Sequence, residues 1–430
     1  MIESENSTST HLVVCVHGLW GNPGHLQYLV DQLINKYGNS ISILNAKCNL
    51  STYTYDGIDI CGDRLVEEIH EKIKSLEDDG IKITKFSIIG YSLGGLFSRY
   101  AIGILYKQGI FNEIQPWIFT TFATPHLGTI SKISKAIPKI ISWASPRILS
   151  KTGEQLSWID KYDGDASLLS VMSDPNRIFF KALELFKYKR IYANTLNDRT
   201  VPFWTAAISE VDPFEESDKL ILSKNKKYDV IIDSVLLKED HCKNTIFNMA
   251  KYLLVAVAAP ILAPLWISFV GAIYVQALCS QRRVQKIIEN RVVNNVVDDK
   301  NNNDGKEKPR DFSKIASSVE RENIEAVTNF ISKKPKLTSA SSSSSKSESE
   351  SSTTESYNPE LYSSSDFPLV PLIDIQRESC NNLNKISFQK YMVHIDGYNA
   401  HAEIVVRNKF FKFLAGKKLI QHFVEESFVL

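Results

Sequence analysis

Short apolar runs alternate with longer amphipathic segments over the first half of the chain. The runs are rich in β-branched and aromatic residues and almost continuously apolar, which predicts strands buried on both faces. Between them, Gly57–Leu76 repeats apolar residues at helical spacing. The predicted strands are Leu12–His17, Ile41–Asn45, Lys85–Gly90, Trp117–Thr124 and Arg190–Asn197. Strands separated by helices indicate an α/β fold with a mostly parallel central sheet and helices on both faces.

The same pattern divides the chain into five parts. Residues 1–10 are polar and predicted to be disordered, and residues 11–241 carry the strand–helix alternation. Residues 252–280 contain no charged side chain, which predicts a hydrophobic membrane or lipid-droplet segment. Residues 298–365 are rich in Ser, Asn, Lys and Glu and cannot bury enough apolar surface to offset their ordering entropy. We expect them to be a disordered tether, and residues 366–430 to complete the core.

The segment Gly90–Gly94 reads Gly-Tyr-Ser-Leu-Gly and fits the pattern G-x-S-x-G. In an α/β-hydrolase this pattern holds the nucleophile on a strained turn between a strand and a helix, where glycines on either side prevent clashes. Here the pattern follows a predicted strand and precedes a helical segment, Gly95–Leu105. A glycine-rich turn with a capping serine is the alternative, but this context favours Ser92 as a nucleophile.

A serine nucleophile needs two amide groups that stabilise the oxyanion. One comes from the residue after the nucleophile, here Leu93, and the other from a loop after an earlier strand. The loop His17–Gly21 follows the first predicted strand, and its glycines allow the backbone to approach a substrate, so Leu19 is the second predicted donor. His17 precedes the serine, whereas this fold orders its triad as serine, acid, histidine, so we interpret it as bracing the loop.

The acid is expected at the end of a later strand. Asp198 follows the apolar run that ends near Ala193 and is therefore the candidate. A turn aspartate that only caps the next segment is the alternative for this residue. Asp163 and Asp165 are rivals, but they lie in a glycine-containing loop with no strand before them.

The base must follow the acid along the chain. His401 comes shortly after Ile386–His394, the last predicted strand, which is where this fold delivers its histidine. His241 is the alternative, although no strand leads to it, and His394 lies within the strand itself. His126 precedes the acid and is expected to shape the acyl pocket or a buried hydrogen bond. The predicted triad of Ser92, Asp198 and His401 requires no metal and no cofactor.

The charge and cysteine content narrow the partners and the compartment. The chain has 430 residues with 50 Lys and Arg against 49 Asp and Glu, so nothing supports a nucleic-acid partner. Its 6 cysteines are scattered without metal-binding spacing, which is typical of a reducing compartment. The N-terminus lacks a cationic start followed by an apolar run, so no signal peptide is predicted.

Five short segments follow one another in a fixed order: His17–Gly21, Gly90–Gly95, Ala123–Gly128, Asn197–Pro202 and His401–Arg407. Together they resemble the eukaryotic putative serine-esterase family of lipases, and most of all its fungal lipid-droplet phospholipase branch. The resemblance extends from Leu12 to about Asp212 and over Lys390–Asn408.

This resemblance implies that Ser92, Asp198 and His401 form the triad of a phospholipase acting at the lipid-droplet surface. The one departure is Tyr91, where relatives usually carry His. Because that position is outside the triad, the predicted roles are unaffected, although the local hydrogen bonding is expected to differ.

The predicted triad constrains the apolar stretch Tyr252–Leu278. Ser92 and Asp198 precede this stretch and His401 follows it, so a single membrane crossing would separate the base from the nucleophile. Either the stretch does not span, or His241 is the base. Two prolines near its middle and basic residues at both ends favour a monotopic hairpin that returns to the cytosolic side. A buried helix pair or a lid over the active site is the alternative.

These observations predict a serine hydrolase of lipid esters, most of all a glycerophospholipid phospholipase. We expect it on a lipid droplet or on the cytosolic face of an intracellular membrane. An acylglycerol lipase or a small-ester esterase is an alternative that the sequence does not separate. From another class, a non-catalytic membrane adaptor on a hydrolase scaffold is favoured only if a triad member is missing, and none is.

Overall fold

The fold was analysed in a computed structural model. It describes residues 9–129, 149–238, 268, 270–290, 367, 369–408 and 412–430. The predicted disordered tether, most of the predicted membrane segment and His241 lie outside these residues.

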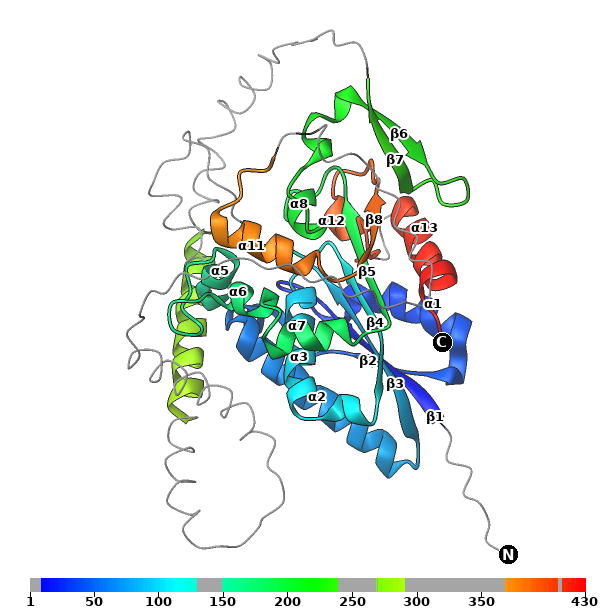
Figure 1. The fold of residues 1–430 in the computed structure, drawn as a ribbon. Helices are drawn as coiled ribbons and strands as arrows, with labels where there is room; N and C mark the ends of the chain where they lie inside the picture. Colours follow the sequence, from blue (N-terminus) through cyan, green and yellow to red (C-terminus); the bar gives the residue numbers. More distant parts are fainter. Residues whose placement is uncertain are drawn as a thin grey trace, which may run out of the picture.

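The strands of the described residues form one eight-stranded sheet. The strands are β1 (Ser9–Val16), β2 (Ile41–Asn45), β3 (Lys82–Tyr91), β4 (Gln115–Phe122), β5 (Tyr188–Asn194), β6 (Leu220–Lys224), β7 (Ile231–Leu237) and β8 (Gln389–Val393). Their order is β2-β1-β3-β4-β5-β8-β7-β6 (Figure 1). Neighbours from β2 to β8 run parallel, and β7 runs antiparallel to both β8 and β6.

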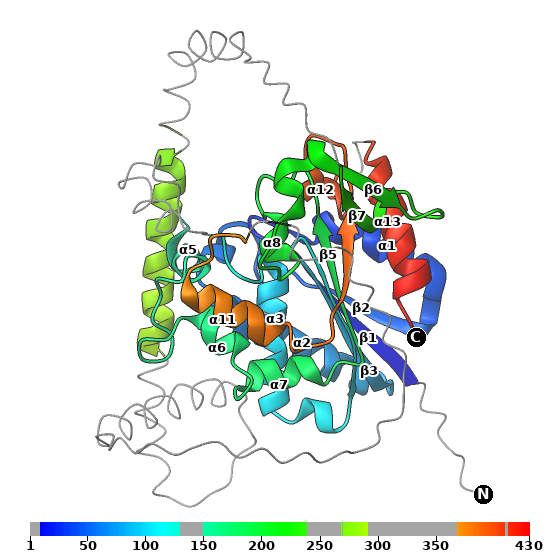
Figure 2. The ribbon, with the colours of Figure 1, turned by 45° about the horizontal axis from the view of Figure 1, so that its top comes forward.

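Helices cover both faces of this sheet (Figures 1 and 2). They include α1 (Gln27–Tyr37), α2 (Ile58–Asp78), α3 (Gly94–Lys107), α7 (Ile178–Glu184), α11 (Asp374–Leu383) and α13 (Leu414–His422). Alternate residues of β1 point to opposite faces, as the strand period requires. Leu12 and Val14 join the apolar core beneath α2 and α3, whereas Val13 and Cys15 join the core beneath α1 and α13.

Short helices connect the remaining elements. They are η1 (Pro23–Leu26), η2 (Gly38–Ser40), η3 (Ser51–Tyr55), η4 (Ile110–Asn112), α5 (Ser150–Leu156), α6 (Leu168–Ser173), α8 (Phe203–Ala206), η5 (Pro213–Lys219), α12 (Ala400–Glu403) and the π-helical turn η7 (Phe423–Ser427). The parallel sheet, its two helical layers and the strand–turn–helix formed by β3 and α3 confirm the α/β-hydrolase fold.

The antiparallel hairpin of β6 and β7 was not predicted. Its strands are largely exposed on one side, with Ile221 and Leu236 facing solvent, so their residues do not form the continuous apolar runs of the central strands. The hairpin joins the sheet only through β8, to which β7 pairs at Ile231 and Ile232. Helices α1 and α11 were also missed.

Between β7 and α11 the chain leaves the core and later returns to it, and backbone hydrogen bonds hold it in the core at both points. After β7, the Lys238 amide donates to the Lys219 carbonyl over 2.9 Å. Where the chain returns, the Val370 amide donates to the Glu210 carbonyl over 2.7 Å, and Leu369 bridges to Val211. The chain therefore leaves the core and returns to it beside the same short stretch, residues 210–219.

Residues 270–290 form a helix that packs against the side of the hydrolase core (Figure 1). Ile273 and Ala277 of this helix are buried against Tyr55 of η3. Ser280 and Arg283 then bond the buried carboxylate of Asp56 over 2.6 and 2.8 Å. The last part of the predicted apolar hairpin is thus docked on the protein, and residues 252–267 lie outside the described residues.

None of the helices that the structure describes is both long enough and apolar enough to cross a membrane.

The contact between α3 and α7 depends on a glycine, and this gives a stability prediction. A Cβ on Gly103 would overlap the ring of Phe179. We therefore expect Gly103→Ala to lower the free energy of unfolding by about 1 to 3 kcal/mol, despite the better helix propensity of alanine. Gly271, which also lies in a helix, has open space around it and serves as the control.

Urea unfolding of the two variants checks this prediction. Gly271→Ala is expected to leave stability unchanged or to raise it by about 0.5 to 1 kcal/mol. Equal stability of Gly103→Ala and the wild type would contradict the prediction.

Candidate active site

Ser92 occupies a strained turn between β3 and α3. Its φ is +54°, a left-handed conformation that is rare for residues other than glycine. The turn closes tightly on itself, because a Cβ on Gly90 would overlap the Cα of Gly95. A Cβ on Gly94 would likewise overlap the carbonyl oxygen of Val16 at the end of β1. These glycines let the turn form, and the turn presents the Ser92 hydroxyl at the carboxyl edge of the sheet.

Two hydrogen bonds bring the three predicted catalytic side chains together. The distance from Ser92 Oγ to His401 Nε2 is 3.0 Å, and His401 Nδ1 lies 2.8 Å from Asp198 Oδ2. His401 is the second residue of α12, which follows β8, and Asp198 follows β5. A proton on His401 Nδ1 donates to the carboxylate, which leaves Nε2 free to accept the serine proton.

Hydrogen bonds keep Asp198 ionised although the residue is mostly buried. Its Oδ1 accepts from the amides of Thr200 and Val201 over 2.9 and 2.8 Å, and its Oδ2 accepts from the Asn194 side chain over 2.9 Å. Burial raises the pKa of Asp198, but the hydrogen bonds from His401, Val201 and Asn194 outweigh burial and hold the pKa below its usual value.

Asn194 is a site residue that the sequence did not reveal. It is the last residue of β5, and its amide bonds the same oxygen of Asp198 that accepts from His401. Its side-chain oxygen is buried and has no hydrogen-bond partner in the described part of the chain. Asn194 lies four positions before Asp198. The signal available in the sequence was a polar residue that closes an apolar strand.

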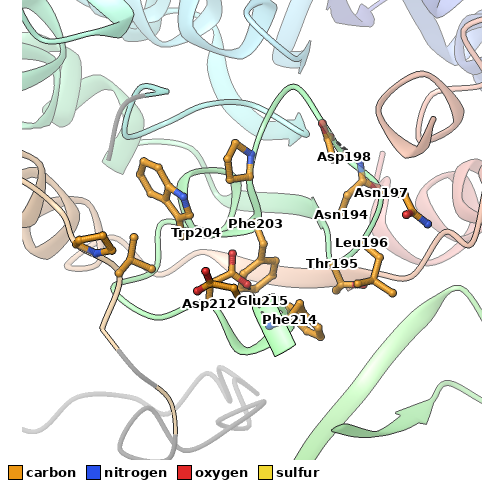
Figure 3. Close-up of a pocket in the computed structure, with 13 residues that line it drawn as sticks. Asn194, Thr195, Leu196, Asn197, Asp198, Phe203, Trp204, Asp212, Phe214 and Glu215 are labelled. Atoms are coloured by element: carbon orange, nitrogen blue, oxygen red, sulfur yellow. Dashed lines mark hydrogen bonds between the residues drawn. The ribbon is translucent and has the colours of Figure 1, made fainter. Parts of the chain in front are cut away.

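A cavity of about 350 Å³ lies beside the acid (Figure 3). Its walls come from the loop after β5, from α8 and η5, and from the returning chain at Val370 and Pro371. Asn194 and Asp198 line it, whereas Ser92 and His401 do not. The cavity therefore borders the acid of the triad but not its nucleophile or its base.

The predicted oxyanion loop passes directly over the nucleophile turn. A Cβ on Gly18 would lie 2.6 Å from the Cβ of Ser92 and 3.1 Å from the amide nitrogen of Leu93, so only glycine fits. This contact brings the loop that carries Leu19 next to the Leu93 amide at the start of α3. Both predicted donors thus lie on the two segments that flank Ser92.

A second layer of contacts fixes this loop. Trp20 has a φ of +52°, and its amide donates to Thr54 Oγ1 over 3.2 Å. Its indole N–H donates to the Tyr55 hydroxyl over 2.8 Å. Tyr55 is fully buried and packs against Ile273 and Ala277 of the 270–290 helix. The oxyanion loop is therefore connected, through η3, to the end of the apolar stretch.

Tyr91 contacts the base from the side of the core. Its hydroxyl donates to the backbone carbonyl of His401 over 2.7 Å, and the two rings lie 5.2 Å apart. Burial raises the pKa of this phenol, so the hydroxyl stays protonated and remains a donor. Tyr91, the position at which this chain departs from the family it resembles, thus helps to hold α12 in place.

Three other histidines considered in the sequence lie in the described part of the chain, namely His17, His126 and His394, and none of them hydrogen-bonds Ser92 there. Burial lowers the pKa of His17, whose ring packs against Gly21, consistent with bracing the loop. His126 bonds Thr121 over 2.9 Å, and burial holds its pKa well below the usual value, so it makes the buried hydrogen bond that was one expectation. His394 pairs with Asp396 over 2.9 Å.

The rival acids are engaged elsewhere. Asp163 accepts from Arg177 over 2.6 Å, and Asp165 pairs with Lys161 over 2.7 Å at the surface. Neither carboxylate hydrogen-bonds a histidine in the described part of the chain. Asp198 is the acid that meets His401.

Residues 6–210 match the family model described as "Putative serine esterase (DUF676)". Over these residues, just under half of the chain, the protein is similar to that family. The matched part contains Ser92, Asp198 and both predicted oxyanion donors, and His401 lies beyond it. The family match therefore agrees with the recognition that the five sequence segments suggested.

Curated relatives of the chain include fungal proteins. The chain is 32% identical over 231 residues to "Putative lipase C4A8.10" of Schizosaccharomyces pombe and 31% identical over 231 residues to "Putative lipase ROG1" of Saccharomyces cerevisiae. These matches cover 51% and 52% of this chain. They span only 29% and 32% of the relatives, so the chain matches about a third of their length.

Among solved structures, the chain is similar to phospholipase PlaB from Legionella pneumophila in complex with thio-NAD. The identity is 14%, the TM-score is 0.29, and the match covers 47% of this chain and 42% of that one. At this score, the fold assignment depends on the strand order and the nucleophile turn described above.

His401→Ala tests the assignment of the base. Because His401 is hydrogen-bonded to Ser92, we expect the variant to lose about 10³-fold or more in kcat on a soluble ester. His394→Ala is the matched control, since His394 lies nearby and pairs with Asp396 instead. Activity retained in His401→Ala and lost in His241→Ala would identify His241 as the base.

Tyr91→Phe tests the contact that holds the base. Removing the hydroxyl leaves the His401 carbonyl without this donor, which is expected to cost about 1 to 3 kcal/mol of unfolding free energy. We also expect kcat to fall severalfold with little change in KM. Tyr37→Phe, which removes bonds to the carbonyls of Val424 and Phe428, is the control and should lower stability without lowering kcat.

Proposed function

We propose that the chain is a serine hydrolase that cleaves carboxylic esters of lipids, with glycerophospholipids as the preferred substrates. The hydrogen-bonded series from Ser92 through His401 to Asp198 is the observation that carries the proposal. The match of residues 6–210 to the serine esterase family supports ester cleavage, and the names of the fungal relatives support a lipid substrate.

The first half of the reaction acylates the enzyme. His401 Nε2 accepts the proton of Ser92 as the hydroxyl oxygen attacks the ester carbonyl carbon. The negative charge that develops on the carbonyl oxygen is stabilised by the amides of Leu19 and Leu93. His401 then protonates the departing alcohol oxygen as the carbon–oxygen bond breaks. The acyl group remains on Ser92.

The second half releases the acid. His401 accepts a proton from water as the water oxygen attacks the acyl carbon, and it returns that proton to Ser92 when the acyl bond breaks. Asp198 keeps its negative charge throughout and stabilises the imidazolium form of His401. The low pKa of Asp198 suits this role, because a protonated acid would not stabilise that charge.

The same geometry supports a monotopic arrangement on a lipid droplet or on the cytosolic face of a membrane. Ser92 precedes the apolar stretch and His401 follows it, yet their side chains are 3.0 Å apart. A chain that passed once through a bilayer would separate them. We therefore propose that the segment between them leaves and returns on one side.

A fluorophosphonate probe and a substrate panel test this function. We expect labelling of the wild type and complete loss of labelling in Ser92→Ala. We also expect faster hydrolysis of phospholipid vesicles than of a triacylglycerol emulsion or a short soluble ester.

Each of the other outcomes would support a different function for this protein. Faster hydrolysis of the emulsion would indicate an acylglycerol lipase, and turnover of the short ester alone a small-ester esterase. Labelling that survives in Ser92→Ala would refute the nucleophile. No labelling and no turnover in the wild type would favour the non-catalytic adaptor.

A further inference from the structure

The helix of residues 270–290 has two different sides in its first half. The side that faces the core buries Ile273 and Ala277, which are spaced by one helical turn. The remaining surface leaves large apolar side chains in solvent, with Tyr274 56% exposed and Val275 57% exposed. Val270 and Leu278 on the same surface are each 38% exposed. A helix that only packed on the core would be expected to carry polar residues there.

Two more exposed aromatic residues lie on the elements that contact this helix. Trp20 of the oxyanion loop is 42% exposed, and Tyr53 of η3 is 47% exposed. The Arg283 guanidinium lies 4.9 Å from the Tyr53 ring, and Tyr55 joins Trp20 to the buried side of the helix. We call these six exposed residues the docking face: Trp20, Tyr53, Val270, Tyr274, Val275 and Leu278.

The composition of this face favours a lipid surface over a protein partner. Trp and Tyr combine an apolar ring with a polar group and are enriched where membranes meet water. Arg282 and Lys286, both exposed, follow the apolar half of the helix and suit anionic headgroups. The sequence that leads into the helix, residues 252–267, has no charged side chain, as expected beside a lipid surface.

Ion pairs to one buried carboxylate hold the helix in place before any lipid is bound. Asp56 is fully buried and accepts from Arg64 over 2.7 Å as well as from Ser280 and Arg283. Both arginines belong to elements that flank η3, so the helix and η3 are joined by charge as well as by apolar contact. The docking face is therefore preformed.

We propose that the docking face seats the protein on a phospholipid surface and turns the oxyanion loop toward it. This inference rests on the proposed lipid-ester hydrolase and specifies how that enzyme meets its substrate. Since Trp20 adjoins Leu19, an ester drawn from the surface reaches the predicted oxyanion donors over a short path. Lipid contact and the catalytic apparatus thus share one edge of the molecule.

The test compares the full-length wild type with the double variant Tyr274→Asp/Val275→Asp. Both positions are more than half exposed, so the charges are tolerated in the folded protein. Ile34→Asp is the matched control, because Ile34 is 49% exposed on α1, which covers the opposite face of the sheet. Binding is measured by cosedimentation with vesicles of phosphatidylcholine containing phosphatidylserine as one-fifth of the lipid.

We expect the double variant to bind these vesicles about tenfold more weakly than the wild type, because two charges would enter the apolar contact. Its turnover of a short soluble ester should stay within twofold of the wild type, which also shows that it is folded. The control should match the wild type in both measurements. Leu278→Asp is a second variant with the same expectation.

Three outcomes would overturn the docking face. The first is that the double variant binds vesicles as well as the wild type does. The second is that the Ile34→Asp control loses as much binding as the double variant. The third is that the wild type does not bind vesicles, which would leave a protein partner as the occupant of this face. If the wild type binds vesicles through this face but hydrolyses no ester, the proposed function fails and the docking face stands.

Discussion

The hydrogen bond between Ser92 and His401 joins residues 309 positions apart in the chain, and the rest of the molecule is arranged so that it can form. β3 and the glycines of the turn place Ser92 at the edge of the sheet. β8, which pairs with β5, brings α12 to the same edge, and the Tyr91 hydroxyl holds that helix by a hydrogen bond to the His401 carbonyl. Because both partners must share one compartment, this single contact also limits how the chain between them can meet a membrane.

Much of this arrangement could be predicted from the sequence, because strand ends and chain order carry strong signals. The apolar run before Ser92 and the strand before Asp198 placed both residues at the carboxyl edge. His401 was identified because it follows the last strand, which is where the fold requires its base. Such inferences need only local patterns and the serine, acid, histidine order of the fold.

The contacts that complete the site could not be predicted, because they join residues with no regular spacing. Asn194 reads as an ordinary strand end, and only the fold aims its amide at Asp198. The link from Trp20 through Tyr55 to Ile273 crosses three segments that are distant in sequence. The docking of residues 270–290 was hidden for a different reason. In the sequence, Ile273 and Ala277 look like the other apolar residues of the stretch. Only the structure shows that Asp56 is a buried partner of Ser280 and Arg283 and so holds this helix on the core.

The two backbone hydrogen bonds at residues 210–219 determine how the length of the segment between residues 239 and 368 affects stability. The chain between residues 239 and 368 begins and ends beside one short stretch of the core, so its ends are held near each other whatever its length. The entropy lost on closing a segment rises only with the logarithm of its length, by about 0.6 kcal/mol for each doubling. Outside the docked helix of residues 270–290, residues can therefore be added or removed there at little cost to stability. The separation of acid and base along the chain is thus free to vary while their separation in space stays fixed.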